Sequence, residues 1–469
     1  MGMALRTVWK LHGSRRRPCV RGLWRGHASI SGKSVLGVAA GDGELRVFVV
    51  AGEVSGDTIA SRLMASLKTL SPFPVRFAGV GGSMMYKQGL KSLFPMEDIS
   101  VMGIWELMPH LGKIRVKLKE TVDAALLFQP HVVVTVDSKG FSFRLLKLLR
   151  ARYYQQYADG PVHFHYVAPS FWAWKGGEAR LKNLAKFVDH IFCILPNEAE
   201  VCESNGLSAN FVGHPILEDA LELNQGEDAS RIWKLAGSRE NFWSKYRVPS
   251  GGTIISLLPG SRLQEVARML PIFVKTVKML KSSISDLLTV VHVAPNQHVE
   301  DYVDGFVRKW PVPVILIPGG ETQPKYEALS ASRVALCTSG TVAVEMQIAR
   351  LPCVVAYRAH FLTELFIRHK AKIPYISLPN ILLNTSVIPE ALFQQCTPEK
   401  LTSLLMELIH DEGLREKQVL AAPEVMKLLW PPEKLAKGAQ QESSGKCLYG
   451  SPSMIAASTI LYYVKTTSI

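Results

Sequence analysis

Residues 45–57 read LRVFVVAGEVSGD, an apolar run of strand length that ends in a glycine-rich turn. Leu45–Ala51 is almost wholly apolar, which is typical of a strand buried on both faces of a parallel sheet. Apolar residues then recur at Ile59, Leu63 and Leu67, the spacing of one face of a helix. A buried strand, a tight turn and an amphipathic helix predict a doubly wound α/β fold.

The alternation of strand and helix continues along the chain and restarts once. The first half has further predicted strands at 75–80, 131–136, 163–168, 189–195 and 210–212. The second half has predicted strands at 253–258, 288–294, 313–317, 333–337 and 353–357. The pattern therefore predicts two doubly wound, Rossmann-like halves with a cleft between them.

Composition divides the chain further. We expect a leader at 1–40, an N-terminal domain at 41–215, a polar linker at 216–250, a C-terminal domain at 251–430, a flexible insertion at 431–452 and a last helix at 453–469. The length of 469 residues fits two such domains.

The positive charge is concentrated in the leader. The chain has a net charge of +14, but residues 1–40 contain eight basic and no acidic residues, which leaves +6 for the rest. This modest excess argues against nucleic-acid binding by the folded part. An acid-free leader rich in Arg, Ser and Gly, without a continuous apolar run, predicts import into the mitochondrion, with the plastid as the alternative.

The cysteines and the apolar runs exclude other classes. The seven cysteines include no Cys-x-x-Cys pair, so the sequence predicts no metal site and no cofactor. No apolar run reaches the roughly 20 residues that a membrane-spanning helix needs. The oligomeric state is left open, a homo-oligomer included.

Two carboxylates follow predicted strands of the N-terminal half. Glu53 comes directly after the strand at 45–51, and Asp137 directly after the strand at 131–136. Ligands of open α/β sheets gather at these strand ends, so both side chains are candidates for the cleft. A carboxylate there could accept a proton from an attacking hydroxyl. Helix capping is the alternative for Asp137, and a plain strand-to-helix turn for the motif around Glu53.

Two turns of the C-terminal half suit an anion. Gly260, Ser261 and Arg262 follow a strand, and their backbone N–H groups and guanidinium could bind a diphosphate. The second turn, Ser339, Gly340 and Thr341, also opens a helix, and Glu345 one turn later could accept hydrogen bonds from ribose hydroxyls. Asn380 could orient a sugar or uracil. Ordinary turns, caps and loops are the alternatives.

Two apolar segments are candidates for lipid or acceptor contacts. Trp172 and Trp174 follow a predicted strand beside a lysine, where they could contact sugar, phosphate or an interface, with core packing as the alternative. A stretch too apolar for a surface loop contains Val101, Met102, Trp105 and Met108, and basic residues follow it. An apolar wedge beside a basic row suits a membrane interface or an acyl-chain groove, unless it is buried inside the domain.

Seven motifs taken in order resemble the lipid-A-disaccharide synthase family. They are GEVSGD at 52–57, GVGG at 79–82, HYVAPSFWAW at 165–174, GHP at 213–215, LLPGSR at 257–262, SGTVAVE at 339–345 and SLPN at 377–380. Each motif is weak alone, and their common order over residues 45–425 makes the resemblance specific.

The resemblance implies a GT-B type fold and an inverting glycosyltransferase that uses no metal. Family members join UDP-2,3-diacylglucosamine to 2,3-diacylglucosamine 1-phosphate, giving a β(1→6) disaccharide 1-phosphate and UDP at a membrane surface. By resemblance, Asp137 is the expected general base, and Glu53, Arg262, Glu345 and Asn380 match positions tied to activity or UDP binding. The N-terminal half is then the acceptor and lipid domain.

One departure leaves the acceptor or the rate open. The bacterial pattern after the aspartate is commonly Ala-Pro-Asp-Phe, but this chain has SKGF at 138–141, which loses a carboxylate and gains a cation. Two alternatives therefore remain. One is another GT-B enzyme, such as a UDP-N-acetylglucosamine epimerase or a transferase with a different acceptor, and the other is a non-catalytic protein that binds lipid or UDP-sugar.

Overall fold

The computed structural model describes residues 34–100, 111–156, 159–223, 239–249, 251–359, 361–431 and 450–464. Most of the expected leader and of the expected insertion lies outside these ranges. The end of the expected leader, however, belongs to helix α1 (Val35–Asp42), where Val35 and Ala39 are buried. A fragment for experiments should therefore begin before Ser34 and not at residue 41.

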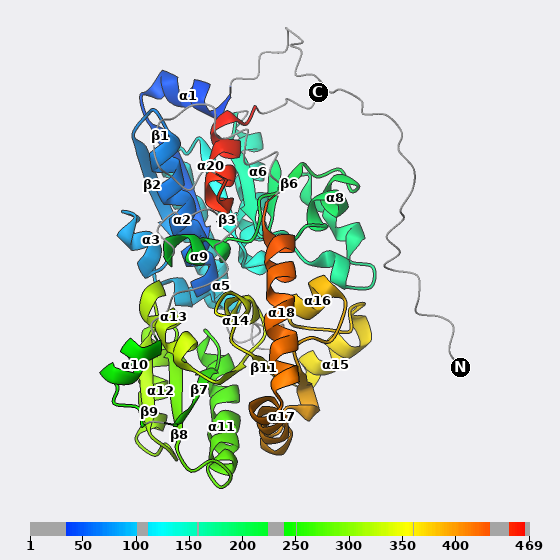
Figure 1. Ribbon diagram of the computed structural model, residues 1–469. Coiled ribbons are helices and arrows are strands. Elements are labelled where there is room, and N and C mark those ends of the chain that lie inside the picture. Colours follow the sequence, from blue (N-terminus) through cyan, green and yellow to red (C-terminus); the bar gives the residue numbers. More distant parts are fainter. Residues whose placement is uncertain are drawn as a thin grey trace, which may run out of the picture. The chain divides into compact units, whose positions relative to one another are not determined.

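The N-terminal lobe is built on a six-stranded parallel sheet with the order β2-β1-β3-β4-β5-β6 (Figure 1). Its strands are β1 (Leu45–Ala51), β2 (Val75–Val80), β3 (Val132–Val136), β4 (Val162–Tyr166), β5 (His190–Cys193) and β6 (Ala209–Phe211). Its helices are α1, α2 (Val54–Leu70), α3 (Ser83–Lys87), α5 (Leu111–Phe128), α6 (Lys139–Gln155), α7 (Leu181–Leu184), α8 (Glu198–Glu203) and α20 (Pro452–Tyr462), with short 3-10 turns at Met96–Ile99, Phe171–Ala173 and Glu178–Arg180.

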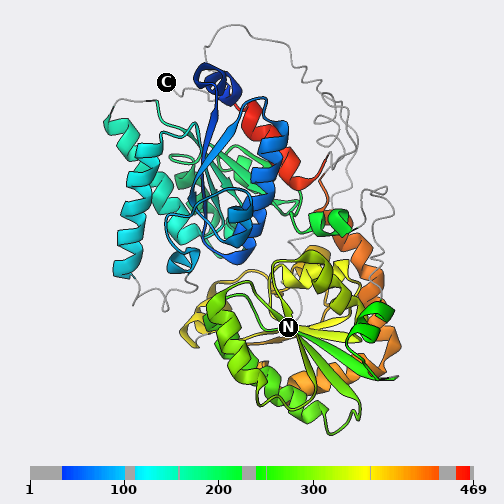
Figure 2. The same ribbon diagram turned by 90° about the vertical axis from the view of Figure 1, so that its left-hand side faces the viewer.

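Both faces of this sheet are covered, as the apolar β1 requires. Leu45, Val47 and Val49 pack in the core that also contains residues of α2 and α20. Phe48 and Val50 point to the other face, into the core formed with α5 and α6. Alternate side chains of one strand thus enter two cores, because successive residues of a strand point to opposite faces. Figures 1 and 2 show α20, coloured red, beside the blue α2.

The C-terminal lobe repeats the plan with the strand order β12-β11-β10-β7-β8-β9, all parallel. Its strands are β7 (Thr253–Leu258), β8 (Leu287–Val293), β9 (Val314–Pro318), β10 (Val334–Cys337), β11 (Cys353–Tyr357) and β12 (Glu390–Leu392). Its helices are α10 (Arg239–Lys245), α11 (Leu263–Leu280), α12 (Gln297–Val307), α13 (Thr322–Ala331), α14 (Val342–Ile348), α15 (Phe361–Lys370), α16 (Leu378–Leu383), α17 (Pro398–His410) and α18 (Glu412–Leu429), with a 3-10 turn at Phe393–Gln395.

Two segments that join the lobes run side by side. His214 N donates to Leu429 O at 2.9 Å, so the chain leaving the N-terminal lobe passes the end of α18. Gly213 has a φ of 90°, and a Cβ on it would lie 2.6 Å from Pro431 Cδ, so glycine is required there. The expected linker also contains α9 (Leu217–Leu223), whose Glu218 and Asp219 are buried.

The predicted fold class is confirmed: each lobe is a doubly wound parallel α/β domain. Strand β12 is one element that the sequence pattern missed. Within the described residues, no helix is long and apolar enough to span a membrane.

Candidate active site

The order of the N-terminal sheet places a crevice between the ends of β1 and β3. The chain proceeds from β1 to β2 on one side and returns to β3 on the other, and such switch points are where open α/β sheets bind ligands. Gly52 directly follows β1, and a Cβ on it would lie 2.6 Å from the Cβ of Ser138. Only glycine lets the two strand ends approach this closely, and it brings Glu53 and Asp137 to the same edge.

Asp137 occupies an unusual backbone conformation at the end of β3. Asp137 and Ser138 have φ values of 46° and 44°, which are left-handed backbone conformations that residues other than glycine rarely adopt. The backbone is held on both sides: Asp137 N donates to Tyr166 O at 2.9 Å, and Ser142 Oγ donates to Asp137 O at 2.7 Å. Residues in such strained conformations concentrate at functional sites. The half-buried Asp137 side chain therefore remains the best candidate base.

A neutral histidine lies below Asp137. His165 is fully buried, and Thr135 Oγ1 lies 2.8 Å from its Nδ1. Burial lowers the pKa of His165 to about 3, against the opposing effect of the Asp137 carboxylate, and the Lys139 ammonium lowers it further. His165 is thus uncharged at neutral pH.

A buried carboxyl fixes one of the predicted tryptophans. Trp172 Nε1 donates to Glu198 Oε1 at 3.2 Å, and Leu195 N donates to Glu198 Oε2 at 3.3 Å. Burial raises the pKa of Glu198 to about 7, although these bonds and the Lys139 ammonium act in the opposite direction. The indole of Trp172 is therefore half-buried and oriented by Glu198.

Trp174 joins the lobes. Its ring centroid lies 5.7 Å from that of Phe366 in α15, and its backbone forms an antiparallel bridge with Ala371. The apolar candidates Val101, Met102, Trp105 and Met108 lie outside the described residues, so their prediction is not tested.

Glu53 and Arg262 connect the two predicted sites. Glu53 lies at the N-terminus of α2, where it accepts a hydrogen bond from Ser55 Oγ at 3.0 Å, and it forms an ion pair with Arg262 at the N-terminus of α11. Burial lowers the pKa of Arg262, and the nearby Glu265 carboxylate opposes this. The end of β1 thus meets the end of β7 through one carboxylate and one guanidinium.

The second crevice lies between the ends of β7 and β10, where the order of the C-terminal sheet also switches. Glu265 joins the two turns there: it accepts a hydrogen bond from Ser261 N at 3.3 Å and further ones from Arg262 N and Thr338. Burial raises the pKa of Glu265, and these bonds oppose the rise. Gly260 has a φ of 121°, and a Cβ on it would lie 2.5 Å from Glu265 Cδ.

These contacts correct one prediction. The N–H group of Ser261, expected to bind phosphate, is taken by the carboxylate of Glu265. The turn of Ser339, Gly340 and Thr341 is open by contrast, since a Cβ on Gly340, whose φ is 114°, would meet no atom within 4 Å.

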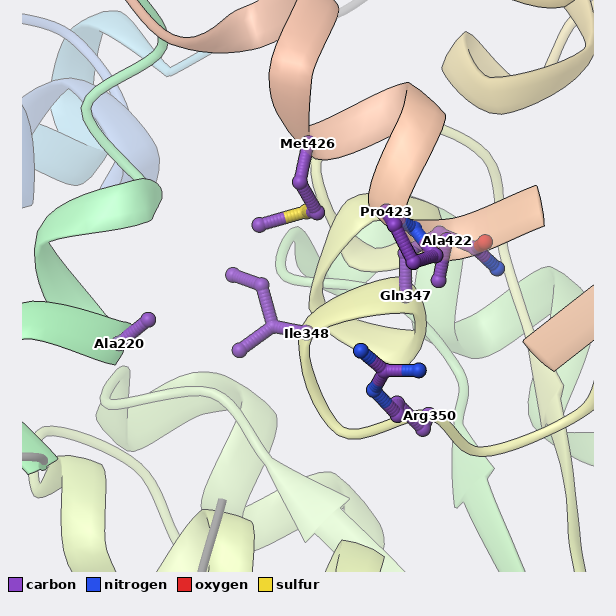
Figure 3. A pocket seen from close by; sticks show the side chains of 7 residues that line it. All are labelled: Ala220, Gln347, Ile348, Arg350, Ala422, Pro423 and Met426. Carbon is purple, nitrogen blue, oxygen red and sulfur yellow. The ribbon is translucent and has the colours of Figure 1, made fainter. Parts of the chain in front are cut away.

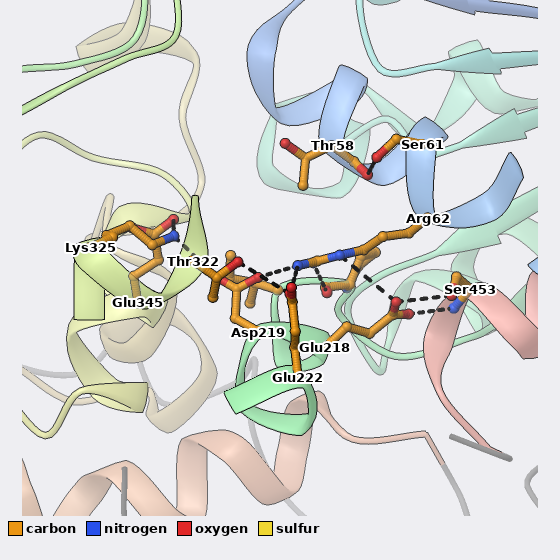
Figure 4. A network of polar contacts seen from close by, with 12 residues as sticks. Thr58, Ser61, Arg62, Glu218, Asp219, Glu222, Thr322, Lys325, Glu345 and Ser453 are labelled. Atoms are coloured by element: carbon orange, nitrogen blue, oxygen red, sulfur yellow. Dashed lines mark hydrogen bonds and ion pairs between the residues drawn. The ribbon is translucent and has the colours of Figure 1, made fainter. Parts of the chain in front are cut away.

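Glu345 belongs to a buried network of charges that links both lobes (Figure 4). Lys325 Nζ lies 3.3 Å from Glu345 Oε1 and 3.1 Å from Asp219 Oδ2. Asp219 also pairs with Arg62 of α2 and accepts a hydrogen bond from Tyr326 at 3.1 Å. One carboxylate thus holds cations from both lobes.

The electrostatics of this network differ between its two carboxyl groups. Burial alone would raise the pKa of Asp219, but Lys325 and Arg62 outweigh it and hold that pKa below its ordinary value. Burial raises the pKa of Glu345, with Lys325 opposing. Glu345 therefore already shares Lys325 with Asp219, and a ribose hydroxyl would have to bond beside this ion pair.

The structure gives Asn380 a different role from the predicted one. The amide is fully buried; its Nδ2 donates to Ile388 O and Glu390 Oε1, both at 2.8 Å, and its Oδ1 accepts from Val387 N and Ile388 N, both at 2.9 Å. An amide has two donor and two acceptor positions, so none remains for a ligand. In this structure Asn380 therefore holds the loop at 387–390 and has no position left for the predicted contact with a sugar or uracil.

A pocket lies at the Glu53–Arg262 junction. It is lined by Val54, Met96, Glu97, Ser100, Ser261, Arg262, Leu263, Gln264, Asn296 and His298. Another pocket, between α9, α14 and α18, is only as large as a water molecule (Figure 3). Its Gln347 Oε1 is buried without a partner among the described residues, so we assign this pocket to structural water.

Known proteins with similar sequences were compared with this chain. The model of the lipid-A-disaccharide synthetase family matches residues 47–441. The chain belongs to this family. It is 61% identical to "Probable lipid-A-disaccharide synthase, mitochondrial" of Arabidopsis thaliana, over 92% of this chain and 94% of that protein. It is 40% identical to "Lipid-A-disaccharide synthase" of Rhodospirillum centenum, over 82% of this chain and 90% of the relative.

Solved structures support the fold. The UDP-GlcNAc 2-epimerase of Neisseria meningitidis, bound to UDP-GlcNAc, matches with a TM-score of 0.54 at 12% identity, over 82% of this chain and 99% of that one. The glycotransferase of kitacinnamycin matches with a TM-score of 0.51 at 14% identity, over 89% and 98%. At such identities the likeness shows the GT-B arrangement alone.

Three residues of the candidate site were not predicted from the sequence: Glu265, Asp219 and Lys325. Glu265 had a local signal, because Ser-x-x-x-Glu around a helix start resembles a capping motif in which an acid bonds back to the first N–H groups. Asp219 and Lys325 gave no local signal, since they are paired across 106 residues.

We expect Glu265→Gln to raise the KM for the nucleotide donor about tenfold or more, with a smaller change in kcat, because the amide bonds the N–H groups of Ser261 and Arg262 more weakly than a carboxylate does. Donor titration in steady-state kinetics measures this. Glu412→Gln, which changes an exposed acid at the start of α18, is the control and should leave KM unchanged. An unchanged KM in Glu265→Gln would show that Glu265 does not position Arg262.

The pKa of Glu198 predicts a pH dependence of stability. Its folded pKa of about 7 lies above the ordinary value of 4.5, so the folded state holds a proton that the unfolded state releases in this range. The free energy of unfolding should therefore fall as the pH rises from about 4.5 to about 7. Glu198→Gln should flatten this slope in urea titrations, and Glu200→Gln, an exposed acid of the same helix, should keep it. A slope retained in Glu198→Gln refutes the assignment.

Proposed function

We propose that this chain joins UDP-2,3-diacylglucosamine to 2,3-diacylglucosamine 1-phosphate and releases UDP and a β(1→6) disaccharide 1-phosphate. Membership of the lipid-A-disaccharide synthetase family supports this activity. The observation that carries it is the pairing of Glu53 with Arg262, since it sets the crevice of Asp137 against the crevice suited to a diphosphate.

The roles follow from the chemistry of one displacement. The 6-hydroxyl oxygen of the acceptor attacks the anomeric carbon of the donor, and its proton passes to the Asp137 carboxylate. The bond between that carbon and the diphosphate oxygen breaks, and UDP leaves with the electron pair. Because attack and departure occur on opposite sides, the anomeric centre inverts.

UDP leaves as an anion, so positive groups placed at the diphosphate lower the barrier. Arg262 supplies a guanidinium suited to bidentate contact, and the open turn of Ser339, Gly340 and Thr341 supplies backbone N–H groups. Glu53 holds Arg262 before the donor binds, and Glu345 faces the ribose beside Lys325. Gly260 provides the conformation of the turn, and Asn380 shapes the loop at 387–390.

The cellular location is proposed from the leader, and contact with a membrane is proposed from the substrates. The acid-free basic leader and the mitochondrial name of the Arabidopsis relative support import into the mitochondrion. Substrates with acyl chains reside in a membrane, so we expect peripheral contact with its surface. Fusion of residues 1–40 to a fluorescent protein tests the import, and plastid fluorescence would overturn it.

A substrate-omission assay tests the proposed activity. Residues 33–469 are incubated with both substrates, with each alone, and with UDP-N-acetylglucosamine, and UDP release is measured. We expect release only with both diacylated substrates. Conversion of UDP-N-acetylglucosamine would instead favour an epimerase, and UDP binding without release would favour a non-catalytic binding protein.

A further inference from the structure

Helix α15 exposes a cluster of large apolar side chains. Phe361, Leu365 and Phe366 are 63%, 57% and 43% exposed, although they lie within six residues of one another. In the described parts of the chain, no other six-residue stretch has three large apolar side chains this exposed. Scattered exposed apolar residues are ordinary, but a contiguous group indicates an interaction surface.

Basic residues continue the same exposed surface. Arg368, His369 and Lys370 fill the last turn of α15 and are exposed. The acid of the helix, Glu364, is buried and accepts a hydrogen bond from Ala359 N at 3.3 Å. Outward, α15 therefore presents aromatic and aliphatic side chains at one end and cations at the other.

The neighbouring segment extends the basic character. Lys175 donates to His369 O at 3.0 Å, and Arg180 lies over the ring of Phe171 at 5.8 Å. One acid is present, Glu178, and it pairs with Lys372 at 3.2 Å. The cations thus exceed the acids around the helix end.

Hydrogen bonds and a ring contact join the end of the helix to the N-terminal lobe. Lys175 N donates to Lys370 O, and Lys372 N donates to Ala173 O, both at 2.9 Å. The ring of Phe366 contacts Trp174, next to the Trp172 that Glu198 orients. The exposed face of α15 therefore lies beside the aromatic segment predicted to meet the acceptor.

We propose that the face of α15 formed by Phe361, Leu365, Phe366, Arg368 and Lys370 docks on an anionic lipid bilayer. Such a bilayer binds apolar side chains at the level of its acyl chains and cations at the level of its anionic headgroups. A single ten-residue helix is too small for a stable protein dimer, which needs about 800 Å² on each partner. The proposal rests on the proposed function only in that lipid substrates bring the chain to a membrane.

Vesicle sedimentation tests the docking. Residues 33–469 are mixed with phosphatidylcholine vesicles, with and without about one-third phosphatidylglycerol, and the bound fraction is measured. We expect Phe361→Ser/Leu365→Ser to weaken binding to the anionic vesicles about tenfold or more, and Arg368→Gln/Lys370→Gln to remove the preference for anionic lipid. Leu127→Ser/Leu420→Ser, which changes apolar residues 88% and 69% exposed elsewhere, is the matched control and should bind as wild type.

The outcomes separate docking from catalysis. Variants that lose vesicle binding but keep wild-type UDP release with detergent-dispersed substrates support the proposal. Variants that bind vesicles as tightly as wild type overturn it. Concentration-dependent dimers that disappear in the variants, without a change in vesicle binding, overturn it in favour of a second copy of the chain. Vesicle binding through α15 by a chain inactive with both substrates upholds the docking and refutes the proposed function.

Discussion

Asp137→Asn is expected to lower kcat by about 100- to 10,000-fold and to leave the affinity for UDP unchanged. The amide cannot accept the proton of the attacking hydroxyl, and asparagine tolerates the left-handed backbone of this position. The bonds to Tyr166 O and from Ser142 Oγ use only the backbone N–H and C=O of residue 137, so the fold should persist.

Steady-state kinetics with both substrates, together with calorimetric titration of UDP, measure the two quantities. Asp123→Asn changes an exposed aspartate of α5 and serves as the control. A kcat for Asp137→Asn within a few-fold of wild type would show that the base lies elsewhere. A loss of UDP affinity would contradict the expectation that Asp137 acts on the acceptor hydroxyl alone.

Asp219→Ala is expected to lower the free energy of unfolding by about 3–5 kcal/mol. The substitution leaves Arg62 and Lys325 largely buried without the carboxylate that they share, and Tyr326 loses its acceptor. The network of Figure 4 would then lack its central anion. Urea denaturation followed by circular dichroism measures the change.

Glu222→Ala is the matched control from the same helix. Glu222 is 62% exposed and lies 3.8 Å from Arg62, so its loss should cost less than about 1 kcal/mol. Equal destabilisation by the two variants would contradict the distinction between a buried and a surface ion pair.

Much of the fold could be predicted because its strands carry local signals. The strands β1 and β3 are almost wholly apolar, and the carboxylates and glycines that follow them lie at the sheet edge. Strand β12 could not be predicted, since a three-residue strand has no periodicity and contains Glu390. Glu390 is needed there because it accepts hydrogen bonds from Ser377 and Asn380.

For the candidate site, the sequence predicted which residues lie at strand ends, but it did not predict their partners. Sequence placed Arg262 and Glu345 near an anion, but their partners are set by tertiary packing: Arg262 pairs with Glu53 of the other lobe, and Glu345 pairs with Lys325. The polar, mixed composition of 216–250 predicts a linker, yet the structure buries Glu218 and Asp219 within it. They are buried because Ser453 and Lys325, distant in sequence, satisfy them.

Determining the product tests the central claim most directly. Residues 33–469 would be incubated with both diacylated substrates in the presence of EDTA, and the product analysed by mass spectrometry and by NMR of the new anomeric centre. We predict a disaccharide 1-phosphate with a β(1→6) linkage, formed with one UDP released for each molecule. An α linkage would contradict a single displacement assisted by Asp137, and the absence of any disaccharide would contradict the proposed transfer itself.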